Sequence, residues 1–305
     1  MILIVTGFII GLLLLLKGAD FFVGGGSGLA ARYRVSPTVI GFTIIAFGTS
    51  LPEFVVNMNA VIAETPDLAL GNVLGSNIAN IALVLALCAI VNPPAIRQDS
   101  GSGGPSEVAL MFGATVIFGL LALRLTIDLL AGIVLLGCFC VIMYLLWKRG
   151  AETKAAIKSH GWRDYLHTAG GLLGVILGAN LLVTAATDLA VILGISPFVI
   201  GMTMVAVGTS LPELATSLVA VVRNQGGISV GNVLGSNIFN LLFVLGCSAL
   251  IRPIGIGSYA DILVLGAFTL AVLPFFRHGN RFRRRWGVLV LLGYSVYLAF
   301  LFDML

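Results

Sequence analysis

The sequence predicts an all-α, polytopic membrane protein. Of its 305 residues, 59% are hydrophobic and only 10% are charged, and the mean hydropathy is +1.09. A soluble domain carries roughly 25% charged residues. The first apolar run has no basic leader and no evident cleavage site, so we expect it to be a spanning helix and not a signal peptide. The expected location is the cell membrane, with the lipid bilayer as the surrounding partner.

Ten segments are apolar over the roughly 20 residues that a spanning helix needs. They are Ile2–Val23, Pro37–Ile62, Leu68–Val91, Val108–Leu123, Thr126–Trp147, Thr168–Leu193, Pro197–Val222, Ile228–Ile251, Tyr259–Phe276 and Trp286–Phe302. The polar, basic stretch 148–166 is expected to be a cytoplasmic linker. It divides the chain into a first unit, 1–147, and a second unit, 167–305, with five helices each.

Basic residues are concentrated after the odd-numbered segments. They are Arg32, Arg34, Arg97, Lys148, Arg149, Lys154, Lys158, Arg163, Arg223, Arg277, Arg281, Arg283, Arg284 and Arg285. The positive-inside rule places these loops in the cytoplasm and therefore both termini outside. The net charge of +4 then reports orientation and gives no indication of nucleic-acid binding. The run from Arg281 to Arg285 is expected to touch anionic lipid, and Lys17 is expected to pair with Asp20 on the first helix.

Two sequence motifs occur twice, and both recur at the same separation along the chain. Gly48–Glu53 reads GTSLPE, as does Gly208–Glu213, and Gly71–Ile78 reads GNVLGSNI, as does Gly231–Ile238. With an odd number of helices per half, the second half starts on the opposite side of the membrane. The halves are therefore predicted to be inverted repeats, an arrangement typical of secondary transporters, whose ion site lies at the midplane between the repeats.

The repeated motifs supply oxygen atoms inside apolar segments. A carboxylate at such a depth is costly and indicates function, and Pro52 and Pro212 free the carbonyl four residues earlier. Spacings of four place oxygen-bearing side chains on shared helix faces. These are Thr49 with Glu53, Ser76 with Asn80, Thr209 with Glu213, and Ser236 with Asn240.

Such an oxygen cage suits a hard cation. Ca²⁺ takes six to eight oxygen ligands, and the same oxygens could be shared among several Na⁺ ions. The motifs contain no sulfur or imidazole, which argues against Zn²⁺ or Cu⁺. Without a cation the two carboxylates repel each other, so protons would compete with the metal and transport is expected to be inhibited at low pH.

These paired motifs resemble the cation/Ca²⁺ exchanger superfamily, and in particular the prokaryotic Na⁺/Ca²⁺ exchangers. The resemblance rests on GTSLPE and on GNVLGSNIAN, ending at Asn80, with the second-half copies ending at Glu213 and Asn240. It covers essentially the whole chain. It implies electrogenic exchange of about three Na⁺ inward for one Ca²⁺ outward. It also implies alternating access, with the first and sixth helices sliding across a core of eight.

The resemblance also assigns roles to residues. It implies Glu53 and Glu213 as the central Ca²⁺ ligands, with the carbonyls of Thr49 and Thr209. Flanking Na⁺ sites would use Ser50, Ser76, Ser210 and Ser236 with the carbonyls of Ala46 and Ala206, and Asn80 and Asn240 would line the middle. Family members often carry an Asp in place of Asn240. One carboxylate is thus absent here, which leaves the stoichiometry, K⁺ dependence and ion preference open.

Other functions stay open from the sequence. The nearest alternatives keep Ca²⁺ and change the coupling ion to H⁺, or to Na⁺ together with K⁺. A cation channel is a different class, but channel filters usually come from symmetric rings of subunits. The motifs contain no histidine pair and no serine beside a base, so no enzyme is predicted. No cofactor or obligate protein partner is evident.

Overall fold

The computed structural model describes residues 2–96, 106–150, 159–193, 208–277 and 279–303. The first-half elements are α1 (Ile2–Tyr33), α2 (Pro37–Ile40), η1 (Gly41–Ile45), α3 (Ala46–Thr49), α4 (Leu51–Ile62), α5 (Pro66–Ala79), η2 (Asn80–Leu85), α6 (Ala86–Val91), η3 (Pro93–Ala95), α7 (Glu107–Ala122), β1 (Thr126–Ile127) and α8 (Leu129–Gly150). The second-half elements are α9 (Arg163–Ile192), α11 (Leu211–Val222), α12 (Gly226–Ile238), η4 (Phe239–Val244), α13 (Leu245–Ile251), β2 (Ile254–Gly255), α14 (Tyr259–Leu270), α15 (Leu273–Arg277) and α16 (Asn280–Asp303). The two short strands pair antiparallel, with Thr126 opposite Gly255.

The all-α membrane fold is confirmed. Among the described residues, seven helices are long and apolar enough to cross a membrane, and an eighth span results if Pro37–Thr49 and Leu51–Ile62 count as one. The other two expected spans contain the shorter apolar helices α7 and α11. Residues 194–207, which include the first part of the seventh expected span, lie outside the described residues. The count of ten and the outside termini stay predictions.

Several helices are longer than the apolar runs that predicted them. Helix α1 continues past Val23 to Tyr33, and α9 and α16 begin at Arg163 and Asn280, ahead of their expected starts. Hydropathy detects only the apolar part of a span, whereas the helix continues through its polar ends. At Thr126, by contrast, the structure forms strand β1, and α8 begins at Leu129.

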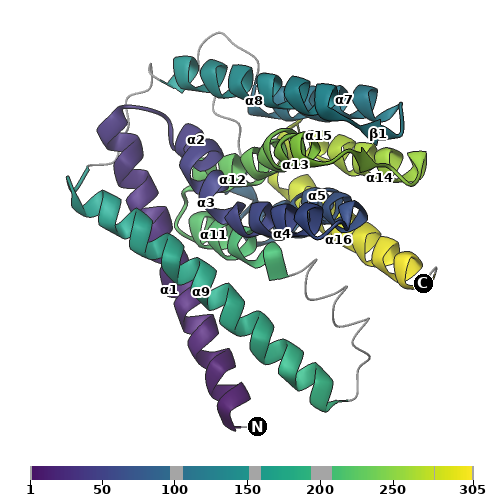
Figure 1. The fold of residues 1–305 in the computed structure, drawn as a ribbon. Coiled ribbons are helices and arrows are strands. Elements are labelled where there is room, and N and C mark those ends of the chain that lie inside the picture. The colour runs from purple at the N-terminus through teal and green to yellow at the C-terminus, as the bar shows by residue number, and fades with distance from the viewer. Residues whose placement is uncertain (1, 97–105, 151–158, 194–207, 278, 304–305) are drawn as a thin grey trace.

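Helices α1 and α9 form a close antiparallel pair that extends away from the other helices (Figure 1). A Cβ added at Gly18 would lie 2.9 Å from the Gly171 carbonyl, and one at Gly11 would lie 3.0 Å from the Gly178 carbonyl. Small residues allow such close approach between spanning helices. The contacts are reciprocal, because Gly171 and Gly178 follow Gly11 and Gly18 at the same separation as the two copies of each motif. The sequence repeat therefore has a structural counterpart.

The remaining helices form a bundle around a large apolar core. Among the described residues, three short π-helical segments, η1, η2 and η4, interrupt its central helices. Such segments are rare and occur frequently at functional sites. Here η1 ends directly before Ala46, η2 begins at Asn80, and η4 contains Asn240.

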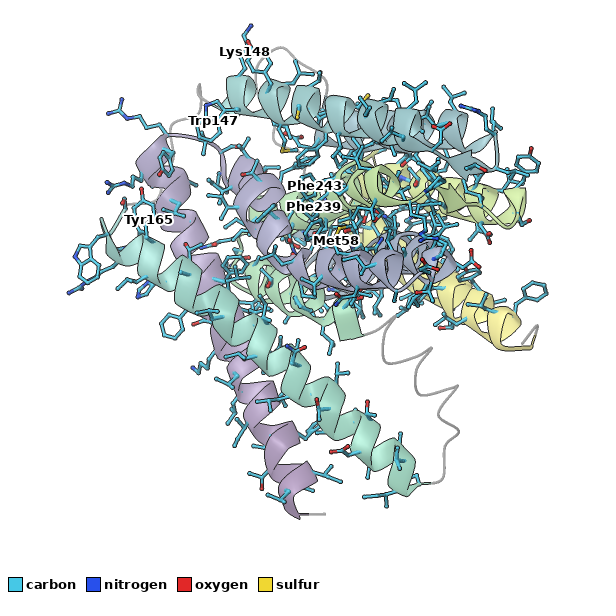
Figure 2. The ribbon with its side chains drawn as sticks, in the orientation of Figure 1. Met58, Trp147, Lys148, Tyr165, Phe239 and Phe243 are labelled. Atoms are coloured by element: carbon cyan, nitrogen blue, oxygen red, sulfur yellow. The ribbon has the colours of Figure 1, made fainter. Side chains whose placement is uncertain are left out.

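Aromatic side chains contact one another in two regions of the molecule. Phe239 and Phe243 stack inside the bundle with ring centroids 4.7 Å apart, and Figure 2 shows them together near Met58. At one end, Tyr165 and Trp147 each contact Tyr33, close to Lys148. Exposed aromatic and basic residues of this kind are typical of a membrane–water interface.

Candidate ion-binding site

Both glutamates stand just after a break in a helix. In the first half the chain bends by 44° between α3 and α4, and Ser50 occupies the break. Helix α4 begins at Leu51, has a proline in its first turn, and carries Glu53 in that same turn. A helix start leaves backbone N–H groups unpaired, and its dipole favours an anion. The bend is the distortion that Pro52 predicts, because its nitrogen cannot donate a hydrogen bond.

The second copy of the motif repeats this local structure. Ser210 precedes α11, which begins at Leu211 and carries Glu213 in its first turn. Helices α4 and α11 therefore span equivalent residues of the two motifs. Each motif places its carboxylate at a helix start inside the bundle, and both glutamate side chains are fully buried.

The two halves contact each other through these motifs. The Ser50 hydroxyl donates a hydrogen bond of 2.9 Å to Oε1 of Glu213, which lies in the other half. Ser236 donates to the same oxygen at 3.4 Å. Glu53 is close enough to Glu213 for their charges to interact. The structure thus brings both carboxylates into one buried region between the halves.

Two threonines complete this crossed arrangement. Thr49 interacts with Glu213, and Thr209 interacts with Glu53, so each threonine faces the glutamate of the other half. The Thr209 contact does not reach hydrogen-bond geometry at the Glu53 oxygens. The Thr49 hydroxyl lies 3.0 Å from Oδ1 of Asn232, its nearest acceptor.

The polar atoms of this region outnumber the hydrogen bonds that they make. Within the described residues, both carboxylate oxygens of Glu53 and one of Glu213 are buried without a hydrogen-bond partner. The side chains of Ser76, Asn80, Ser210 and Asn240 are in the same condition. Buried polar groups are nearly always paired, so a cluster of unpaired oxygens indicates a site built for something that binds oxygen.

In the described part of the chain, no buried basic side chain compensates the two carboxylates. Among the described residues, the buried charged side chains are Glu53, Glu107, Asp164 and Glu213, all of them acidic. Burying an unpaired carboxylate costs several kcal/mol per ion. Together with the oxygen-only donor set, this charge favours a hard cation as the occupant.

Two asparagines that the sequence reasoning left without a role hold the glutamates in place. Asn72 donates to the Glu53 backbone carbonyl at 3.3 Å, and Asn232 donates to that of Glu213 at 3.4 Å. Each amide also donates to the side chain one helical turn beyond its glutamate on α4 or α11: Asn72 to Asn57 at 2.5 Å, and Asn232 to Ser217 at 2.9 Å. The available signal was the spacing, since each asparagine follows its glutamate by the same number of residues.

Of the two alanine carbonyls that the resemblance implied as Na⁺ ligands, only that of Ala46 lies in the described part of the chain. The Ala46 carbonyl accepts the Ser50 N–H at 3.0 Å, and the Thr49 hydroxyl lies 3.3 Å away. The Ala46 carbonyl thus accepts hydrogen bonds from its own helix, and its role as a cation ligand stays a prediction. Ala206 lies outside the described residues.

The buried carboxylate pair between two similar halves defines a membrane transporter for cations. The family model for the sodium/calcium exchanger protein matches residues 3–148 and 165–302. The chain belongs to the sodium/calcium exchanger family.

Individual relatives match over nearly their full length. The putative antiporter CaxA of Alkalimonas amylolytica is 35% identical, over 97% of each chain. The sodium/calcium exchanger MaX1 of Methanosarcina acetivorans is 30% identical, over 96% of this chain and 97% of its own. A solved structure of the sodium-calcium exchanger NCX_Mj, soaked with 10 mM Na⁺ and 10 mM Sr²⁺, superposes with a TM-score of 0.86 at 34% identity and covers 98% of both chains.

Proposed function

We propose that the chain is a secondary antiporter that exchanges Na⁺ for Ca²⁺ across the cell membrane. The observation that carries the proposal is the buried pair of Glu53 and Glu213, without a buried basic partner among the described residues. Three of their four carboxylate oxygens are unpaired, and further unpaired polar side chains lie on elements that contact α4 and α11. Two carboxylates neutralise one Ca²⁺, and their oxygens also suit Na⁺. The family match and the full-length relatives support the same ions.

The Ca²⁺ site would be built from both halves at once. In this proposal Glu53 and Glu213 are the charged ligands, and the carbonyls of Thr49 and Thr209 complete the centre. The flanking Na⁺ positions use Ser50, Ser76, Ser210 and Ser236 with the carbonyls of Ala46 and Ala206. Asn80 and Asn240 line the middle, and their unpaired amides are consistent with that role. Asn72 and Asn232 position the glutamates without touching the ion.

Exchange by alternating access follows from a two-fold relation between the halves. We propose two inverted repeats, residues 1–147 and 167–305, joined by the linker 148–166. The reciprocal glycine contacts between α1 and α9 and the crossed threonine contacts at the site support this relation. The paired helices α1 and α9 are then the element that moves against the bundle. No catalytic chemistry is assigned to the site.

The coupling ion is left open by the residues at positions 80 and 240. Asn at both 80 and 240 leaves two carboxylates in the cage. Two negative charges balance one Ca²⁺ or two Na⁺, so a third Na⁺ would enter a site that has no remaining charge to neutralise it. We therefore keep coupling to H⁺, or to Na⁺ together with K⁺, as outcomes of the same experiment.

Sealed vesicles containing the purified protein test the proposal. They are loaded with Na⁺ and diluted into Na⁺-free buffer, and ⁴⁵Ca²⁺ uptake is followed. We expect uptake that requires the Na⁺ gradient and responds to an imposed membrane potential. Uptake that is unchanged when the Na⁺ gradient is removed contradicts Na⁺ coupling, and replacing that gradient with one of H⁺ or K⁺ then identifies the coupling ion. Single-channel currents would instead favour a channel.

A further inference from the structure

A basic cavity lies at the start of α16, on another part of the molecule from the ion site. It has a volume of about 360 Å³ and is lined by Pro93, Pro94, Asn280, Arg281, Arg284 and Arg285. Three arginines thus line one concave site. None of the three forms an ion pair with an acidic side chain among the described residues. Because like charges repel each other, a cavity lined by three arginines favours an anion.

Two of the arginines in this turn donate hydrogen bonds to backbone carbonyls, and the other two do not. Arg283 is committed to protein contacts: its Nε donates to the Phe275 carbonyl at 2.6 Å and its Nη1 to the Pro93 carbonyl at 3.3 Å. Arg284 donates through Nε to the Ile90 carbonyl at 3.0 Å, which orients its guanidinium group. Arg281 and Arg285 make no such contacts within the described residues and remain exposed. The first turn of α16 contains no acidic residue, although its dipole favours negative charge there.

The face of α16 below the cavity is apolar and exposed. Arg284, Val288, Leu292 and Val296 are spaced by four, so they lie on one helix face. The last three are 43%, 57% and 70% exposed. An anion bound at the cavity therefore has an apolar surface directly beside it along the helix. Free phosphate would make no use of that surface, whereas the acyl chains of a lipid would cover it.

Trp286 places the cavity at the depth of lipid headgroups. Its ring stacks on Phe282, and its Nε1 donates to the Ala271 carbonyl at 2.8 Å. Tryptophan at the end of a spanning helix is typical of the membrane–water interface. Basic pockets between spanning helices on the cytoplasmic side bind anionic headgroups, and the predicted orientation puts this end in the cytoplasm.

We propose that this arginine-lined cavity binds the phosphate of an anionic phospholipid headgroup. The guanidinium groups of Arg281, Arg284 and Arg285 would hold the phosphate, and the acyl chains would lie along Val288, Leu292 and Val296. The occupant bridges η3 and the start of α16. Because the cavity is separate from Glu53 and Glu213, the proposal does not depend on which ions the protein exchanges.

Lipid binding is measured by native mass spectrometry of the full chain, with phosphatidylglycerol and phosphatidylcholine as probes. The wild type is expected to retain one phosphatidylglycerol with clear preference over phosphatidylcholine. Each arginine near an anionic lipid contributes roughly a fivefold factor in affinity. R281Q/R285Q, which breaks no described hydrogen bond, should therefore weaken that binding about 25-fold. The matched control R34Q/K148Q removes two exposed charges elsewhere at the predicted cytoplasmic side and should leave the binding unchanged.

Three results would overturn the proposal. Equal loss in R281Q/R285Q and in R34Q/K148Q would show general surface attraction and no defined site. Unchanged phosphatidylglycerol binding in R281Q/R285Q would exclude the cavity. Displacement of the lipid by an equal concentration of inorganic phosphate or glycerol phosphate would show that the cavity binds phosphate without regard to acyl chains. The single variants R281Q and R285Q repeat the test if the double variant is unstable, each with an expected loss of about fivefold.

Discussion

Replacing Glu213 with Gln is expected to produce opposite effects in the presence and absence of Ca²⁺. The glutamate is fully buried, accepts hydrogen bonds from Ser50 and Ser236, and has one oxygen without a partner. Gln keeps the size of the side chain and one oxygen acceptor but removes the charge. The effect of the substitution therefore isolates the charge from the packing.

With Ca²⁺ present, Glu213→Gln removes one of the two charges that hold the ion. Breaking a buried charge pair by removing one partner costs about 3–5 kcal/mol. At about 1.4 kcal/mol per factor of ten, the affinity for Ca²⁺ should fall by roughly 10²-fold to about 4 × 10³-fold. Equilibrium ⁴⁵Ca²⁺ binding to purified protein in detergent measures this loss, and Glu53→Gln should produce a loss of the same order.

Without Ca²⁺ or Na⁺, the same substitution should stabilise the protein. A buried carboxylate costs several kcal/mol, whereas an unpaired amide costs about 1–3 kcal/mol, so a gain of about 1–2 kcal/mol is expected. At this chain length that gain raises the apparent melting temperature by roughly 2–3 °C. Thermal unfolding in ion-free buffer, followed by a Ca²⁺ titration, measures both effects on one sample.

The matched control is Glu64→Gln, which makes the same chemical change at the surface. The Glu64 side chain is 69% exposed and pairs with Arg252 at 2.6 Å. An exposed ion pair contributes about 0–1 kcal/mol, so neither Ca²⁺ affinity nor stability should change measurably. If Glu213→Gln retains the full Ca²⁺-dependent rise in melting temperature, the assignment of the two glutamates as ligands is refuted.

Three further predictions concern the site and its access. Because protons compete with Ca²⁺ for Glu53 and Glu213, the Ca²⁺ concentration for half-maximal uptake should increase as the pH falls from about 8 to about 6, and an unchanged value would argue that no proton enters the site. Asn240→Asp adds a third carboxylate, so it should increase the number of Na⁺ ions exchanged per Ca²⁺. The reversal potential of vesicle uptake measures this ratio, and an unchanged ratio would exclude residue 240 from the Na⁺ sites. Arg223→Gln breaks the ion pair with Asp20 that joins the α11–α12 connection to α1, so it should change the accessibility of cysteines introduced on either side of the site. Ca²⁺ affinity should change less than about fivefold, since an exposed pair contributes about 1 kcal/mol at most. Equal accessibility in Arg223→Gln and wild type would show that the pair does not control access.

Much of the proposed site can be read from the sequence, because two short motifs contain its charged and polar residues. A carboxylate in an apolar segment is conspicuous at Glu53, and its repetition at Glu213 predicted that the two would meet. Spacing within one helix does not reveal contacts between helices. The crossed hydrogen bond from Ser50 to Glu213 therefore came only from the structure, as did the support that Asn72 and Asn232 give to the glutamate backbone.

Two features of the structure could not be predicted from hydropathy or from spacing along a single helix. No sequence pattern predicts the π-helical turn at Asn80, because such a turn depends on how neighbouring helices pack. The expected pair of Lys17 with Asp20 is wrong. In the structure Asp20 pairs with Arg223, which belongs to the other half of the chain. A charged side chain at a helix end takes the partner that folding brings to it, and spacing along its own helix does not identify that partner.

The two halves are alike at the proposed ion site and unlike where α1 and α9 contact the bundle. The contacts of α1 with the α11–α12 connection include the Asp20–Arg223 pair and a hydrogen bond from Ser27 to Gln225. The sequence repeat makes Asn180 the equivalent of Asp20 and Ala63 the equivalent of Arg223, and these two residues cannot form an ion pair. A two-fold arrangement with identical contacts at both ends would hold its two access states at equal energy. In the proposed alternating-access mechanism, an ion pair at one end alone would favour the state in which that end is closed. The symmetric residues would then determine which ions bind, and the asymmetric ones would determine on which side the site opens at rest.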